Sequence, residues 1–72
     1  MKYRRFIKII EDNGFECTTP AKATSHRKYT ARRDGRLYVI TVSYHLLSDE
    51  ITPGTQSSMI RQSGLPKKLF RK

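Results

Sequence analysis

The N-terminal segment carries apolar residues at a helical period. Between Lys2 and Asn13 they recur at the i, i+3, i+4, i+7 spacing that stacks side chains on one stripe of a helix: Tyr3, Phe6, Ile7 and Ile10. Gly14 follows at the position where a left-handed residue ends a helix, and Phe15 can then fold back on the apolar stripe. The pattern predicts an amphipathic helix over residues 2–13.

The middle of the chain alternates with period two. Two alternating runs, His26 to Arg33 and Arg36 to Tyr44, flank Asp34-Gly35, which is a strong signal for a two-residue type I′ turn. This turn places Arg33 opposite Arg36 and so fixes every other cross-strand pair. One side of the hairpin then carries three pairs: Tyr29 with Ile40, Ala31 with Tyr38, and Arg27 with Val42. The other side carries His26, Lys28, Thr30, Arg32, Leu37, Val39, Thr41 and Ser43.

The flanking segments complete the predicted fold. Residues 15–19 can form a first strand, and residues 20–24 form a loop because a proline cannot donate to a strand ladder. Thr52-Pro53 predicts the N-cap and first position of a second helix that ends at Gly64. One more helical turn can pack Leu69 and Phe70. We therefore expect an α+β fold of order α-β-β-β-α, with a three-stranded antiparallel sheet, both helices on one face and the other face open.

Composition narrows the class of partner. The chain has 72 residues, the size of a single domain, which we expect to span 1–72. Fifteen Lys and Arg against six Asp and Glu give a formal charge of +9, which indicates a polyanionic partner. No apolar run reaches the roughly 18 residues of a membrane span, and the basic N-terminus lacks the apolar run of a secretion signal. The single Cys17 fits a reducing compartment, so we expect a cytoplasmic location and no membrane partner.

Cations crowd the start of the first helix. Lys2, Arg4 and Arg5 lie at the positive end of the helix dipole, and Glu11 and Asp12 lie at the negative end. Two interpretations stay open, tolerated electrostatic frustration and a basic helix end that binds a partner.

The residues that can carry chemistry are the two histidines. One cysteine and two histidines 19 positions apart give no ligand spacing, so we expect no metal and no cofactor. His26 begins the second strand on the open face, with Lys28 two residues further. If the third strand continued, His45 would lie diagonally opposite, within about 7–8 Å. RNA cleavage without a metal needs a base for the ribose 2′-OH, an acid for the leaving 5′-oxygen and cations for the phosphorane, and this patch has candidates for each. The alternative is that both histidines are ordinary surface side chains.

The positive charges fall into two groups. The loop and hairpin carry Lys22, Arg27, Lys28, Arg32, Arg33 and Arg36, and the C-terminal region carries Arg61, Lys67, Lys68, Arg71 and Lys72. We expect most of them to contact phosphates or to form a solvated surface, because phosphate contacts dominate such interfaces. Tyr44 and Tyr3 can stack on bases if they are exposed, although the position of Tyr3 on the apolar stripe favours the core.

Motifs along nearly the whole chain resemble one family. They are Asn13-Gly14-Phe15, Thr24-Ser25-His26, Asp34-Gly35-Arg36, Val42-Ser43-Tyr44-His45, Ile51-Thr52-Pro53-Gly54-Thr55, Ile60 and Gly64-Leu65. In this order they resemble the HicA mRNA interferase toxins. The resemblance implies a fold like that of double-stranded-RNA-binding domains, metal-independent cleavage of mRNA, and neutralisation by a HicB antitoxin.

The resemblance also implies roles for individual residues. His26 matches the catalytic histidine of a Gly-Ser-His-His motif, in which Thr24 here replaces the glycine and Arg27 the second histidine. Ser43 replaces the proline of a Val-Pro-x-His segment, in which His45 is kept. We therefore expect His26 to be the general acid or base, with auxiliary or RNA-binding roles for Lys28, His45, Lys22, Arg27 and Arg32. The rival functions are a non-catalytic basic RNA-binding module and an accessory protein of the ribosome or DNA.

Overall fold

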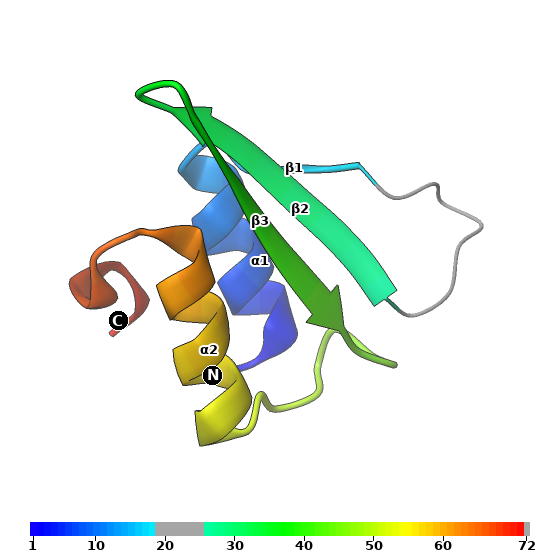
Figure 1. Cartoon of the computed structure of the whole chain (residues 1–72). Helices are drawn as coiled ribbons and strands as arrows, with labels where there is room; N and C mark the ends of the chain where they lie inside the picture. The colour runs from blue at the N-terminus through cyan, green and yellow to red at the C-terminus, as the bar shows by residue number, and fades with distance from the viewer. Residues whose placement is uncertain (19–25, 72) are drawn as a thin grey trace.

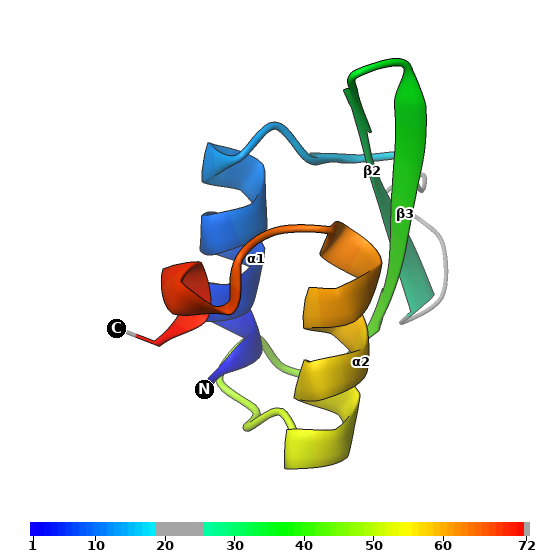
Figure 2. The ribbon, with the colours of Figure 1, turned by 60° about the vertical axis from the view of Figure 1, so that its left-hand side comes forward.

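The computed structural model describes residues 1–18 and 26–71. The elements follow the order α1 (Tyr3–Asp12), β1 (Glu16–Cys17), β2 (His26–Arg33), β3 (Arg36–Ser43), α2 (Pro53–Ser63) and a 3₁₀ turn, η1 (Lys67–Phe70). The antiparallel sheet has the strand order β1-β2-β3. Both α-helices lie on the same side of this sheet (Figures 1 and 2). The α+β fold expected from the sequence is therefore confirmed.

The hairpin has the register that the sequence predicts. Asp34 and Gly35 have φ angles of 51° and 75°, the positive values that a type I′ turn requires. Arg33 pairs with Arg36, and the pairing runs without a slip to His26 opposite Ser43. The two faces separate accordingly, because a period-two pattern sends alternate side chains to opposite sides. The side that faces the helices buries Tyr29, Ala31, Ile40 and Val42.

The end of α1 also follows the prediction. Gly14 has a φ of +94°, in the left-handed region. Its N–H donates to the Glu11 carbonyl at 3.2 Å, and the Phe15 N–H donates to the Ile10 carbonyl at 3.0 Å. These two bonds are those of a Schellman motif, in which a residue beyond the cap packs back on the helix. Phe15 does so and is only 2% exposed.

The start of α1 is completed by a distant loop. Lys2 makes no side-chain cap, but the Tyr3 N–H donates to the Asp49 carbonyl at 3.1 Å and the Arg4 N–H to the Leu47 carbonyl at 2.9 Å. The N-terminal ammonium lies 3.0 Å from a Glu50 carboxylate oxygen. The loop after β3 therefore satisfies donors that the first turn of a helix leaves unpaired.

The second helix has the predicted ends but not the predicted cap. It begins at Pro53 and stops at Gly64, whose φ is +67°. Thr52 occupies the N-cap position, yet its hydroxyl donates to the Thr55 hydroxyl at 2.9 Å instead of accepting a bond from a helix N–H. At the other end the Ser63 hydroxyl donates to the Ile60 carbonyl at 2.6 Å, so a fully buried serine is satisfied within the helix.

The first strand is shorter than expected. It comprises Glu16 and Cys17, which pair with Thr30 and Tyr29. Phe15 is not in the strand because its N–H is used in the helix cap. Thr18 adds one further hydrogen bond to β2, from its N–H to the Lys28 carbonyl at 2.8 Å. The predicted end of the strand at position 19 and the loop over 20–24 lie outside the described residues.

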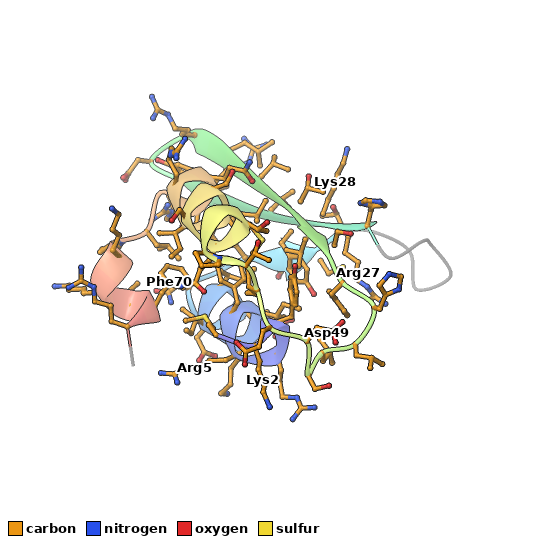
Figure 3. The ribbon with its side chains drawn as sticks, turned by 90° about the horizontal axis from the view of Figure 1, so that it is seen from below. Lys2, Arg5, Arg27, Lys28, Asp49 and Phe70 are labelled. Carbon is orange, nitrogen blue, oxygen red and sulfur yellow. The ribbon has the colours of Figure 1, made fainter. Side chains whose placement is uncertain are left out.

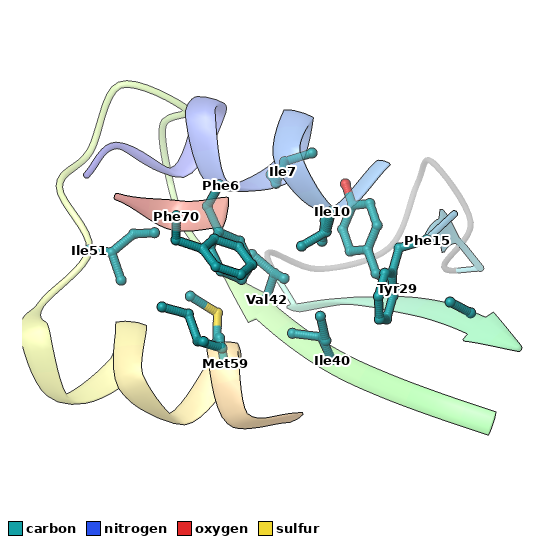
Figure 4. Close-up of a cluster of buried hydrophobic side chains, with 12 residues drawn as sticks. Phe6, Ile7, Ile10, Phe15, Tyr29, Ile40, Val42, Ile51, Met59 and Phe70 are labelled. Atoms are coloured by element: carbon teal, nitrogen blue, oxygen red, sulfur yellow. The ribbon is translucent and has the colours of Figure 1, made fainter. Parts of the chain in front are cut away.

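One core joins the helices, the sheet and the 3₁₀ turn. Phe6, Ile10, Ile40 and Val42 are fully buried in it (Figure 4). The predicted C-terminal turn packs as expected, because the Phe70 ring stacks on that of Phe6 with centroids 5.2 Å apart. This packing anchors the sheet on its helix-facing side, and no helix of residues 1–18 or 26–71 covers the opposite side.

Burial in the core changes the acidity of Tyr29. Desolvation raises its pKa to about 12, helped by Cys17, Tyr44 and Glu11 and opposed by Arg27. An unfolded tyrosine loses its proton near pH 10. Between these values the native state keeps a proton that the unfolded chain releases, so the stability that is present below pH 10 falls as the pH rises toward 12.

We expect this effect to cost about 1 kcal/mol of unfolding free energy between pH 8 and pH 11, the lower half of that window. Urea denaturation at pH 8 and pH 11 measures it, with Tyr29→Phe as the control for all other titrating groups. The variant should lose less stability than the native chain between the two pH values. An equal loss would contradict the assignment to Tyr29.

Candidate active site on the open face of the sheet

The open face of the sheet collects three of the predicted site residues. His26, Lys28 and Arg32 lie at alternate positions of β2, and all three are exposed. Figure 3 shows Lys28 pointing away from the helices. The strand rise of about 3.3 Å per residue places the Cα atoms of His26 and Lys28 roughly 7 Å apart. An imidazole and an ammonium group can therefore approach the same phosphate.

β1 adds one carboxylate to this face, because Glu16 pairs with Thr30 and is exposed. β3 adds no charge. β3 contributes Leu37, Val39, Thr41 and Ser43, of which Leu37 is 54% and Val39 41% exposed. Ser43 lies directly opposite His26. The cations of the face are thus those of β2, next to a strip of small and apolar side chains.

Arg27 lies on the other side of the sheet. It is half-buried, and its guanidinium carbon lies 5.5 Å from the centre of the Tyr44 ring. Figure 3 places it on the opposite side of the strand from Lys28. Tyr44 in turn lies 5.5 Å from the Tyr3 ring, and both tyrosines pack against the core. The structure therefore gives these rings a packing role and separates Arg27 from His26 and Lys28.

His45 follows the sheet without belonging to it. β3 ends at Ser43, so the continuous strand that would set His45 diagonally opposite His26 is not formed. His45 is exposed at the start of a loop whose next residue, Leu46, donates its N–H to the Asp49 carboxylate at 3.1 Å. The hydrogen bond from Arg4 to Leu47 ties the same loop to α1. Its anchored backbone keeps His45 near the end of β3.

One predicted residue cannot be placed. Lys22 lies outside the described residues, together with Thr24 and Ser25 of the motif that precedes His26. The expected contribution of this segment to RNA binding stays a prediction.

Arg33 has a role that the sequence reasoning missed. Grouped there with the phosphate contacts, it instead donates from Nη2 to the Ser63 carbonyl at 2.6 Å, and its guanidinium lies 4.4 Å from the centre of the Tyr38 ring. It therefore closes the C-terminal end of α2 against the sheet. The side of the sheet on which Arg33 lies could be predicted from the sequence, because the period-two pattern puts it on the same side as Tyr29 and Ala31.

The basic side chains of α1 border a separate hollow. A pocket of about 430 Å³ lies between α1 and the end of the sheet, lined by Arg4, Ile7, Lys8, Glu11, Tyr29, Tyr44 and Leu47. Tyr29 faces the helices, so this pocket lies on the opposite side of the sheet from His26. The charges of α1 and those of β2 form two distinct basic regions.

Among residues 1–18 and 26–71, no three His, Cys, Asp or Glu side chains gather as a metal site would require. Within the same residues, no helix is both long and apolar enough to span a membrane.

Comparisons with known proteins give one match. A family model described as the HicA toxin of bacterial toxin-antitoxin matches residues 3–65 of the chain. No curated protein and no solved structure matches it. The matched range includes α1, the whole sheet and α2.

Proposed function

The chain belongs to the HicA toxin family of bacterial toxin–antitoxin systems, and from this membership we propose that it is a metal-independent endoribonuclease that cleaves mRNA. A toxin role and an antitoxin partner follow from the family itself. The proposal adds the reaction, the substrate and the residues. We further propose that residues 1–72 act as a single toxin domain in the cytoplasm, against a HicB-like antitoxin.

The observation that supports the reaction is the placement of His26. It is exposed on a face that no helix of the described residues covers, and Lys28 lies two residues further along the same face. RNA needs such an accessible surface, because a side chain must reach the ribose and the phosphate together. Arg32 extends the positive charge along the same strand, where it can bind a neighbouring phosphate.

The chemistry requires two proton transfers. The 2′-oxygen of the ribose attacks the adjacent phosphorus, the bond from phosphorus to the 5′-oxygen breaks, and a 2′,3′-cyclic phosphate and a 5′-hydroxyl result. His26 either removes the 2′-OH proton or supplies the proton to the departing 5′-oxygen. Lys28 stabilises the charge that develops on the phosphorane oxygens. His45 is the candidate for the complementary transfer, from the loop that follows β3.

The rival function is a non-catalytic RNA-binding module. The same basic face would bind RNA through phosphates, with an affinity that falls as salt concentration rises. Such a module would bind RNA in the same way but would yield no cleavage products.

We expect the purified chain to cleave RNA in the presence of excess EDTA. The products should end in a 2′,3′-cyclic phosphate and begin with a 5′-hydroxyl, because the ribose 2′-oxygen is the nucleophile. DNA of the same sequence is the matched control and should stay intact, since it lacks that oxygen. Denaturing gel electrophoresis and mass spectrometry of the termini give the answer. Salt-dependent RNA binding without products would favour the rival module instead.

A further inference from the structure

β3 forms a long outer edge of the sheet. The strand order β1-β2-β3 leaves β3 with one neighbour, and it runs for eight residues, Arg36–Ser43 (Figure 1). The opposite edge is β1, which has only two residues. A short edge strand offers little to pair with, whereas a strand of eight residues presents a row of unpaired backbone groups.

The hairpin register shows which groups point outward. In a two-residue hairpin the residues next to the turn, Arg33 and Arg36, exchange both backbone hydrogen bonds, and such pairs alternate with pairs that exchange none. Leu37, Val39, Thr41 and Ser43 therefore direct their N–H and C=O groups away from β2. The bond from the Thr18 N–H to the Lys28 carbonyl supports this assignment, because Lys28 pairs with Thr41 and its carbonyl points outward toward β1.

These outward groups are not used by the rest of the fold. In the described part of the chain, the backbone hydrogen bonds outside the helices and the strand ladders include none from Leu37, Val39, Thr41 or Ser43. Their side chains are exposed as well. The backbone groups of these four residues can therefore form hydrogen bonds with another extended segment.

The composition of the edge is unusual for a surface strand. The seven residues 37–43 contain no charged residue, no proline and no glycine, in a chain of which 29% is charged. Soluble proteins protect such edges with lysines, prolines or bulges, and an unprotected one either pairs with a partner or promotes aggregation. The absence of these devices here indicates that pairing is used.

The chemistry of the edge restricts the partner. An alternating row of N–H donors and C=O acceptors is matched by an extended peptide, as in β-strand addition. A second copy of this chain is disfavoured, because each copy carries a formal charge of +9 and pairing would join their basic faces in one sheet. An acidic peptide segment has the complementary charge.

We infer that β3 accepts a strand of the antitoxin as a fourth strand of the sheet. This inference rests on the toxin role above, not on the cleavage reaction. Neighbouring strands lie about 4.8 Å apart, so the added strand would lie roughly 10 Å from β2, which carries His26 and Lys28. Acidic side chains on the added strand can reach the cations of β2 and exclude RNA, while the backbone pairing itself needs no contact with His26.

The test uses amide hydrogen exchange by NMR on the ¹⁵N-labelled chain, alone and with the unlabelled antitoxin encoded by the adjacent gene. In the isolated chain the amides of Leu37, Val39, Thr41 and Ser43 should exchange rapidly. In the complex they should become protected, at least 10-fold, whereas those of Tyr38 and Ile40 are protected in both states. Failure to form a complex, or a complex in which the four outward amides still exchange rapidly, would overturn the inference. So would their protection at high concentration of the chain alone, which indicates a second copy.

A pair of variants tests the backbone directly. Val39→Pro removes one outward N–H, at an edge position where proline is tolerated, and Val39→Ala removes the side chain but keeps that N–H. Calorimetry should show binding about 10- to 100-fold weaker for the proline variant than for the alanine variant. Equal affinities would overturn the inference, and amide chemical shifts across the core verify that both variants are folded. RNA cleavage is assayed separately, so its absence would count against the proposed reaction without affecting this result.

Discussion

Replacing His26 with alanine is expected to abolish growth arrest in cells that express the chain and to lower the rate of RNA cleavage about 10²- to 10⁴-fold. That range is what a positioned acid or base contributes to a reaction. His26 is exposed at the end of β2, so the substitution removes no core packing, and the fold should be retained. Initial rates in EDTA and colony counts after induction measure the two effects.

His45→Ala is the matched control for this substitution. It removes an exposed imidazole from the loop after β3 and leaves the β2 face unchanged. If His45 supplies the second proton transfer, its variant should also be slow. If His26 acts with another group, the His45 variant should stay within about tenfold of the native rate. Undiminished cleavage by the His26 variant would refute its assignment as the catalytic residue.

Replacing Gly64 with alanine is expected to cost more stability than the same change at Gly14 or Gly35, the other described glycines with a positive φ. The left-handed backbone at φ +67° costs a non-glycine residue about 1–2 kcal/mol. The added Cβ would also lie 2.5 Å from Tyr38 Cε1 and 2.7 Å from Arg33 Nη2. Arg33 Nη2 is the donor to the Ser63 carbonyl, and the Tyr38 ring stacks with the same guanidinium, so displacing them disturbs the contact that closes α2 against the sheet.

We expect a total cost of about 2–4 kcal/mol, a large share of the stability of a domain this small. Gly35→Ala is the control, because Gly35 has a φ of +75° and nothing within 4 Å of its added Cβ. The difference between the two variants in the loss of unfolding free energy, measured by urea denaturation, isolates the steric clash of the added Cβ with Tyr38 and Arg33. If both variants lose the same free energy of unfolding, this clash does not contribute to the destabilisation.

Features set by neighbouring residues could be predicted from the sequence. The hairpin register follows from Asp34-Gly35, and the end of α1 follows from Gly14 and Phe15, because a turn type or a cap depends on a few consecutive residues. The register in turn placed His26 and Lys28 together on the open face. The part of the candidate site that lies on one strand was therefore predictable from local rules.

Features that join distant segments could not be predicted in this way. The carbonyls of Leu47 and Asp49 complete the first turn of α1 from more than 40 positions away, and no periodic pattern carries that information. Arg33 reaches Ser63 across 30 positions, although its side of the hairpin was known. The end of β3 at Ser43 was missed because Tyr44 continues the alternation, yet its ring packs with Tyr3 and Arg27 outside the ladder.

We propose that the open face of the sheet both binds RNA and cleaves it through His26. Single-turnover cleavage of one labelled RNA in EDTA, measured beside the binding of the same RNA, tests this directly for the native chain and the His26→Ala variant. We predict that both bind with similar affinity and the same salt dependence, and that only the native chain yields products. Equal rates of cleavage by the two proteins, or binding without products by both, would contradict the account.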